Sequence, residues 1–152
     1  MCSSDLYEAN TTDAQKWKLY KQKDGSYEIV SAANGMALDV YAAGTKPESK
    51  VWAYTRNDTP AQRWKIAKNP TYPGGGKYDP ADWAPYTLSP MCAPSLKLDV
   101  RSASKDNGAA IQIYTANLTN AQNWAIMDNG DATWTFVNVG SGKVLDVKGG
   151  GK

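Results

Sequence analysis

Two short motifs each occur three times in the sequence, and the spacing of the copies is the strongest constraint on its fold. The first motif is Ala-Gln-x-Trp, at residues 14–17, 61–64 and 121–124. The second is Leu-Asp-Val, at residues 38–40, 98–100 and 145–147. Two of the aspartates are each followed 25 residues later by a motif tryptophan. Two of the tryptophans are each followed 22 residues later by a motif aspartate. These intervals define a repeat of about 47 residues, a period typical of repeat architectures.

One interval departs from this period. Trp64 to Asp99 is 35 residues, so this link carries an excess over the other copies. The excess falls within residues 69–85, a stretch rich in proline and glycine. Such residues punctuate regular structure, so we expect an inserted surface loop at 69–85.

Within each repeat the pattern is that of short β-strands. Runs with alternating polarity are separated by turn signals such as Asp24-Gly25 and Asn129-Gly130, and no segment keeps a helical period. Four short strands per unit predict an all-β chain. Solenoids and propellers are open on this evidence, as is a threefold closed barrel, which removes exposed sheet edges.

Strand alternation assigns side chains to faces. Leu38 and Val40 must face the core, so Asp39 between them faces outward, and the other two motif aspartates follow. By the same rule Trp52 and Tyr54 face outward. The tryptophans of the Gln-x-Trp motif share a face with a following aliphatic residue, so we expect them in the core.

Composition excludes several functions. The 152 residues include no histidine, which excludes histidine-based acid–base catalysis, histidine triads and histidine metal ligands. A formal net charge of +2 is too small to favour nucleic acid or an anionic membrane, and no apolar run is long enough to span one. The chain has six tryptophans and nine tyrosines but one phenylalanine. Tryptophan and tyrosine carry a polar group on the ring, so this composition suits a surface where rings pack and also contact a polar ligand.

The paired motifs resemble those of the ricin-B-type β-trefoil lectins, a group that includes carbohydrate-binding modules of bacterial glycoside hydrolases. The resemblance covers nearly the whole chain except residues 1–6 and 69–85. It implies a β-trefoil of three four-stranded repeats that binds sugar without a cofactor or a metal. In this family an aspartate of the Leu-Asp-Val strand, a stacking aromatic ring, a polar residue shortly after it and a supporting glutamine form the sugar site.

Carried over residue by residue, the resemblance implies three carbohydrate-binding clusters. The first is Asp39, Tyr54, Asn57 and Gln62; the second is Asp99, Tyr114, Asn117 and Gln122; the third is Asp146, Tyr7, Asn10 and Gln15. The asparagines have a second interpretation, because each stands in an Asn-x-Thr triplet that suits an Asx turn or a glycosylation acceptor. Trp52 suits either a surface ring or a second stacking platform.

One departure from the family pattern limits what is carried over. Many members place a polar, sugar-contacting residue directly before the glutamine, where this chain has Ala14, Ala61 and Ala121. The identity of the sugar is therefore not transferred.

The third cluster joins opposite ends of the chain. Asp146 would reach Tyr7 in 13 residues across the termini, against the 15 that separate Asp39 from Tyr54. The ends can close a permuted third repeat, or the two halves can belong to successive units of a longer array. We expect the pocket to be the weakest of the three. Residues 1–6 resemble the translation of a sequencing adapter, so the domain is predicted to span 7–152 after a non-native leader.

The resulting expectation is a non-catalytic carbohydrate-binding domain. Its ligand would be a mono- or polysaccharide, with no nucleic-acid partner and no membrane insertion. It would be an extracellular appendage, fused to a larger secreted protein such as a bacterial glycoside hydrolase or an adhesin. The alternative is a trefoil used for protein–protein contact, as an inhibitor or a structural spacer. An enzyme ranks third, because no cluster of carboxylates stands out besides the three sites.

Overall fold

The structure is a computed structural model, and it describes residues 2–68 and 85–148. The loop expected at 69–85 thus lies outside the described residues, apart from its last position. The strands are β1 (Cys2–Tyr7), β2 (Trp17–Lys21), β3 (Tyr27–Ser31), β4 (Ala37–Val40), β5 (Ser49–Tyr54), β6 (Trp64–Lys68), β7 (Tyr86–Pro90), β8 (Leu96–Val100), β9 (Ala109–Thr115), β10 (Trp124–Asp128), β11 (Trp134–Asn138) and β12 (Val144–Val147).

The helical segments of the described residues are short. They are the 3₁₀ turns η1 (Asp13–Gln15), η2 (Tyr41–Ala43), η3 (Pro60–Gln62), η4 (Arg101–Ala103) and η5 (Asn120–Gln122). Within the same residues, no helix is long and apolar enough to span a membrane. The expectation of an all-β chain is confirmed.

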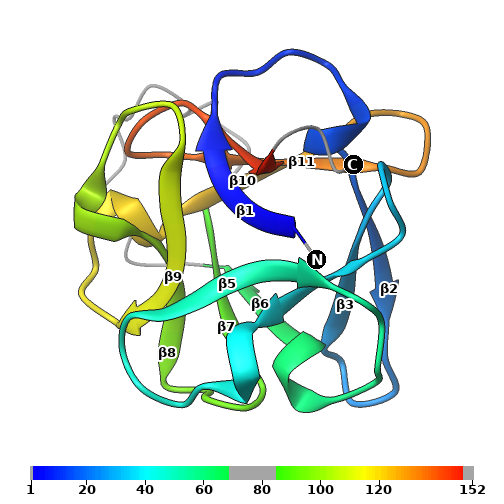
Figure 1. Ribbon diagram of the computed structural model, residues 1–152, viewed down its shortest axis with the longest axis vertical. Helices are drawn as coiled ribbons and strands as arrows, with labels where there is room; N and C mark the ends of the chain where they lie inside the picture. The colour runs from blue at the N-terminus through cyan, green and yellow to red at the C-terminus, as the bar shows by residue number, and fades with distance from the viewer. Residues whose placement is uncertain (1, 69–84, 149–152) are drawn as a thin grey trace.

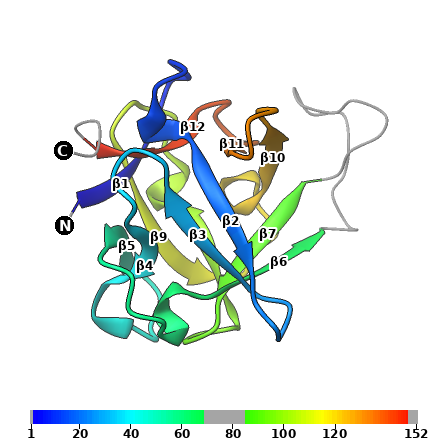
Figure 2. The same cartoon turned by 90° about the vertical axis from the view of Figure 1, so that its right-hand side faces the viewer.

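Six strands close into a barrel. The antiparallel pairings run β2–β3, β3–β6, β6–β7, β7–β10, β10–β11 and back from β11 to β2. Figures 1 and 2 show β2, β3, β6 and β7 running along one side of this barrel. Closure gives every barrel strand a neighbour on both sides, which removes the unpaired edges that promote aggregation.

The remaining six strands form three hairpins that cap the barrel. They are β4–β5, β8–β9 and the pair formed by β12 and β1 from opposite ends of the chain. The hairpins also pair with one another through β1–β5, β1–β9 and β5–β9, so they form a triangular cap. The repeats β3–β6, β7–β10 and β11–β12–β1–β2 give a β-trefoil in which one repeat is split between the termini, as predicted.

The tryptophans of the Gln-x-Trp motif connect the two motifs within each repeat. Trp17, Trp64 and Trp124 are fully buried, which confirms their expected place in the core. Each indole Nε1 donates a hydrogen bond to the carbonyl oxygen of the leucine in its own Leu-Asp-Val strand, at 3.0 Å for Trp64 and Leu38. In the split repeat Trp17 Nε1 donates to Leu145 at 3.3 Å, so this contact joins the two chain ends.

A turn signal seen in the sequence also has its expected geometry. Gly25 has a φ of +87°, in the left-handed region where glycine is favoured, and it connects β2 to β3. Asp24 Oδ1 accepts a hydrogen bond from the Ser26 backbone N–H at 2.9 Å, which closes the turn.

Residues 2–6, part of the segment expected to be a non-native leader, belong to β1. Leu6 is fully buried in the core, and Ser4 Oγ donates a 2.6 Å hydrogen bond to the Val51 carbonyl. The origin of this segment stays a prediction. In the structure it completes the third hairpin, as Figure 1 shows where β1 crosses the cap.

Candidate functional site

The structure places the three Leu-Asp-Val aspartates at equivalent positions, each beneath a 3₁₀ turn of its own repeat. The turns η3, η5 and η1 contact β4, β8 and β12 respectively. Asp39, Asp99 and Asp146 are only 5%, 4% and 7% exposed. The sequence analysis predicted that these side chains face outward, but they are not exposed to solvent. They do lie opposite the apolar pair of the strand, but the turn and the cross-strand neighbour cover them.

The second cluster shows how the glutamine organises a site. Gln122 Nε2 donates to Asp99 Oδ2 at 2.7 Å and to the Thr115 carbonyl at 2.8 Å. Gln122 Oε1 accepts from the Asn117 backbone N–H at 3.1 Å. Burial raises the pKa of Asp99, and hydrogen bonds from Gln122 and Gln112 act in the opposite direction. The glutamine therefore fixes the carboxylate and the loop that follows the tyrosine at once.

An open pocket of about 390 Å³ adjoins Asp99. Its lining includes Asp99, Gln112, Tyr114 and Asn117. Tyr114 is half-buried and Asn117 is exposed. The volume falls within the range of small-molecule sites, roughly 300–1,000 Å³. A carboxylate acceptor, an amide and an aromatic ring thus converge on one hollow.

The first cluster has the same framework but a different neighbour for the aspartate. Gln62 Oε1 accepts from the Asn57 backbone N–H, and Gln62 Nε2 donates to the Thr55 carbonyl, both at 2.9 Å. Trp52 Nε1 donates to Asp39 Oδ2 at 2.7 Å. Burial raises the pKa of Asp39, and hydrogen bonds from Trp52 and Gln62 oppose this rise.

The third cluster brings residues from both chain ends together. Gln15 Oε1 accepts from the Asn10 backbone N–H, and Gln15 Nε2 donates to the Glu8 carbonyl, both at 2.9 Å. A pocket of about 730 Å³ is lined by Tyr7, Asn10 and Asp146 among others. The split between termini does not prevent the cluster from forming. Its rank in sugar affinity stays a prediction.

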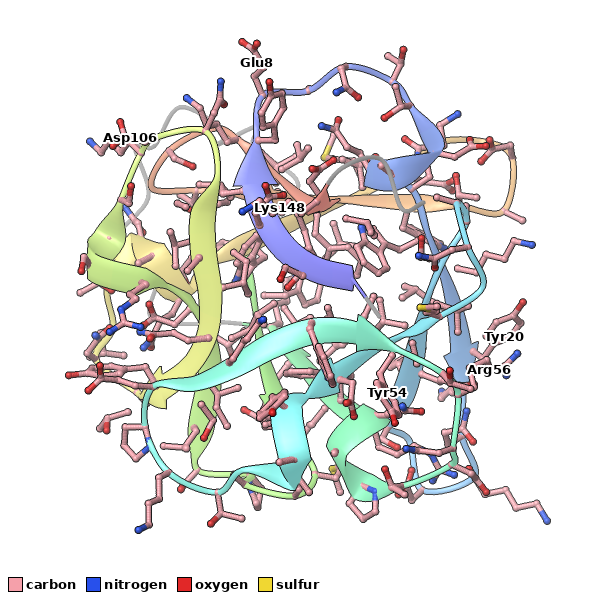
Figure 3. The ribbon with its side chains drawn as sticks, viewed as in Figure 1. Glu8, Tyr20, Tyr54, Arg56, Asp106 and Lys148 are labelled. Atoms are coloured by element: carbon pink, nitrogen blue, oxygen red, sulfur yellow. The ribbon has the colours of Figure 1, made fainter. Side chains whose placement is uncertain are left out.

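In this third cluster the aspartate faces a second carboxyl group. Asp5 stands directly opposite Asp146 in the β1–β12 register, and both are buried. Burial, and then the hydrogen bond and the charge of Asp146, raise the pKa of Asp5 to about 7, while the charge of Lys148 acts to lower it. Figure 3 shows Lys148 beside β1, where the terminal strands meet.

Asn10 and Asn117 form the Asx turns that were the alternative interpretation. Asn117 Oδ1 accepts from the Thr119 backbone N–H at 3.1 Å and from its hydroxyl at 2.7 Å, and Asn10 does the same with Thr12. Asn57 Oδ1 accepts from the Thr59 hydroxyl at 2.8 Å. Because Oδ1 is engaged, the Nδ2 group is the part of each side chain that can meet a ligand.

Sequence reasoning singled out Trp52 but missed that one position in each repeat contacts the motif aspartate. The residue directly opposite the motif aspartate is Trp52 in the first repeat, Gln112 in the second and Asp5 in the third. The signal was present, because Trp52 and Gln112 both follow their aspartate by 13 residues. Only the strand register shows that this position touches the carboxylate.

Comparisons with known proteins agree with the β-trefoil fold. The family model described as ricin-type beta-trefoil lectin domain-like matches residues 13–77 and 87–152. Among solved structures, a designed 3-fold symmetric protein, ThreeFoil, shares 28% identity at a TM-score of 0.69, over 90% of this chain and 81% of that chain. No curated protein matches this sequence.

Two further structures are larger proteins that share the fold. A mosquitocidal holotoxin is 18% identical at a TM-score of 0.67, over 91% of this chain but 15% of the holotoxin chain. An exo-beta-1,3-galactanase from Clostridium thermocellum is 20% identical at a TM-score of 0.62, over 93% of this chain and 28% of the galactanase chain. The chain thus spans a small part of each.

Proposed function

Because the chain belongs to the family of ricin-type β-trefoil lectin-like domains, we propose that it binds carbohydrate through its aspartate-centred clusters and performs no catalysis of its own. The sugar-binding residues proposed are the aspartate, tyrosine, asparagine and glutamine of each cluster. A sugar has a C–H face that packs on an aromatic ring and a rim of hydroxyls that bond to carboxylate and amide groups.

The observation that carries this proposal is the second cluster. Asp99 is held by Gln122 on one side, and it lines a pocket shared with the Tyr114 ring. A hydroxyl donated to such a carboxylate contributes roughly 1.5–3 kcal/mol before competing costs. The tyrosine supplies the apolar face that a sugar ring needs. Repetition of the same framework in three repeats favours a repeating ligand over a protein partner.

We also propose that the domain serves as an appendage of a larger secreted protein and works outside the cell. The similarity to one part of the holotoxin and of the galactanase supports this, because each carries a trefoil within a longer chain. Several modest sites on one domain suit a polymeric glycan, since the second contact becomes intramolecular.

A glycan array followed by titration calorimetry tests the function. We expect binding to neutral glycans, and we expect Asp99→Asn or Tyr114→Ala to weaken it at least tenfold. Tyr20→Ala is the matched control, because Tyr20 is 42% exposed on the barrel strand β2 and packs on Arg56 (Figure 3). Equal loss in the control, or binding to a protein with no glycan binding, would contradict the proposal.

The non-catalytic part of the proposal has its own test. We expect the purified chain to release no reducing ends from any polysaccharide that it binds. Hydrolysis that a single Asp or Glu substitution outside the three clusters abolishes would show an enzyme instead.

A further inference from the structure

The indole of Trp52 makes the contacts in the first cluster that a bound sugar would need. Trp52 lies opposite Asp39 in the β4–β5 register, and its Nε1 donates to Asp39 Oδ2 at 2.7 Å. The same ring stacks on Tyr54, with centroids 5.1 Å apart and planes 20° from parallel. One side chain thus engages both the carboxylate acceptor and the aromatic face.

Other side chains hold the indole in this position. Tyr41 meets it edge to face, with centroids 4.8 Å apart, and Lys50 Nζ lies 5.6 Å from its centroid. Edge-to-face aromatic pairs and cation–π contacts both stabilise a ring beyond the apolar area that it buries. Displacing Trp52 therefore means breaking a hydrogen bond to a buried carboxylate and several ring contacts together.

The second cluster provides the internal comparison. The position equivalent to Trp52 is Gln112, which pairs with Asp99 in the β8–β9 register. Glutamine has no ring to lay against Tyr114, and here the structure has an open pocket that both Gln112 and Tyr114 line. The two clusters share their aspartate, tyrosine, asparagine and glutamine. They differ at this position and at Tyr41, whose counterpart in the second cluster is Arg101, a residue of the pocket lining.

We propose that Trp52 fills the sugar space of the first cluster and closes it, so that carbohydrate binding is left to the second and third clusters. The inference rests on the proposed function and narrows it from three sugar-binding clusters to two, because it names the residue that sets the number of working sites. It also makes the first cluster, and not the third, the weakest of the three in the wild type. It also decides between the two roles that the sequence leaves open for Trp52. The ring is neither a surface group without a role nor a platform on which sugar stacks. It occupies the space that a sugar would fill.

Reciprocal substitutions test this directly. Trp52→Gln gives the first cluster the residue of the second, and Gln112→Trp does the reverse. D-galactose, D-mannose and D-xylose serve as probes in titration calorimetry, with the best binder used for all variants. We expect Trp52→Gln to add one site per chain and Gln112→Trp to remove one. In the wild type Asp39→Asn should change the affinity less than twofold, whereas in the Trp52→Gln background it should remove the added site.

Two outcomes would overturn the inference. A loss of sites in Trp52→Gln would make the indole a stacking platform. A tenfold loss of binding in wild-type Asp39→Asn would show that the first cluster works with Trp52 in place. If no variant binds any glycan, the proposed function itself fails, whereas binding that depends on Asp99 with no gain in Trp52→Gln defeats this inference alone.

A second readout needs no sugar. In ¹H–¹⁵N spectra of the unliganded chain, the Trp52 indole N–H should exchange slowly with solvent and should shift in Asp39→Asn. The Trp52→Gln spectrum assigns the signal by its disappearance. Exchange at the rate of a free indole, with no shift in Asp39→Asn, would place the ring outside the cluster and overturn the inference.

Discussion

The carboxyl pair of the third cluster makes stability depend on pH, and Asp5→Asn isolates its effect. Asp5 is 5% exposed, and its Oδ1 is a buried atom with no hydrogen-bond partner among the described residues. The pKa of Asp5 rises from 3.8 to about 7. Between these two values the folded chain holds a proton that the unfolded chain has released. Stability therefore falls as pH rises from about 4 to about 7, and this contribution is constant above that range.

The size of the effect follows from the same shift. Each pKa unit corresponds to about 1.4 kcal/mol. Solvent access through the adjoining pocket reduces both the cost of burying the Asp5 charge and its repulsion from Asp146, so we expect a loss on the order of 2–3 kcal/mol. Asp5→Asn removes the charge while keeping the shape. Near pH 4 the free energy of unfolding of the variant should match that of the wild type within about 0.5 kcal/mol. Near pH 8 the variant should be more stable than the wild type by most of the expected loss of about 2–3 kcal/mol. Burial still raises the pKa of Asp146, so a smaller pH dependence should remain in the variant.

Urea unfolding followed by tryptophan fluorescence, at intervals from about pH 4 to pH 8, measures both profiles. Asp106→Asn is the matched control, because Asp106 is exposed on an outer loop (Figure 3) and lies outside the third cluster. Its profile should parallel that of the wild type. Parallel profiles for Asp5→Asn and the wild type would refute the paired-carboxyl reasoning.

Three further substitutions probe the fold and the frame of the site. Trp124→Ala removes a fully buried ring and its 3.2 Å hydrogen bond to the Leu98 carbonyl, so urea unfolding should show a loss of about 3–5 kcal/mol. Gln122→Ala leaves the buried Asp99 without its 2.7 Å donor; we expect a loss of about 1–3 kcal/mol by the same method, and weaker glycan binding by calorimetry. Leu118 is 80% exposed and has a φ of +60°, a backbone conformation that costs less for glycine than for leucine. Leu118→Gly should therefore stabilise the fold by up to about 1 kcal/mol and raise the thermal midpoint. Unchanged stability in the first two variants, or a lowered midpoint in the third, would count against these assignments.

The sequence predicted most of the fold because the fold is periodic. Equal spacing of the two motifs identified the three repeats, and alternation placed Trp64 in the core and Tyr54 on the outer face. The split third repeat was also foreseen, and the shortfall of two residues across the termini does not prevent β1 from pairing with β12.

The surroundings of the aspartates could not be predicted in this way. Alternation gives the direction of a side chain but not what covers it, so the burial of Asp39 was missed. The contact of Trp52 with Asp39, like that of Asp5 with Asp146, depends on cross-strand register and on side-chain rotamers. The first six residues, set apart as a leader, supply Asp5, and so the carboxyl pair was not foreseen either.

The most direct test of sugar binding at the aspartate-centred clusters is a crystal structure of the chain with the strongest glycan from the array. The account predicts a sugar ring against Tyr114, with hydroxyls within hydrogen-bond distance of the Asp99 carboxylate and the Asn117 amide. It also predicts that the indole of Trp52 still lies on Asp39 and Tyr54. A glycan bound elsewhere on the barrel, with the Asp99 pocket filled only by water at saturating ligand, would contradict the account.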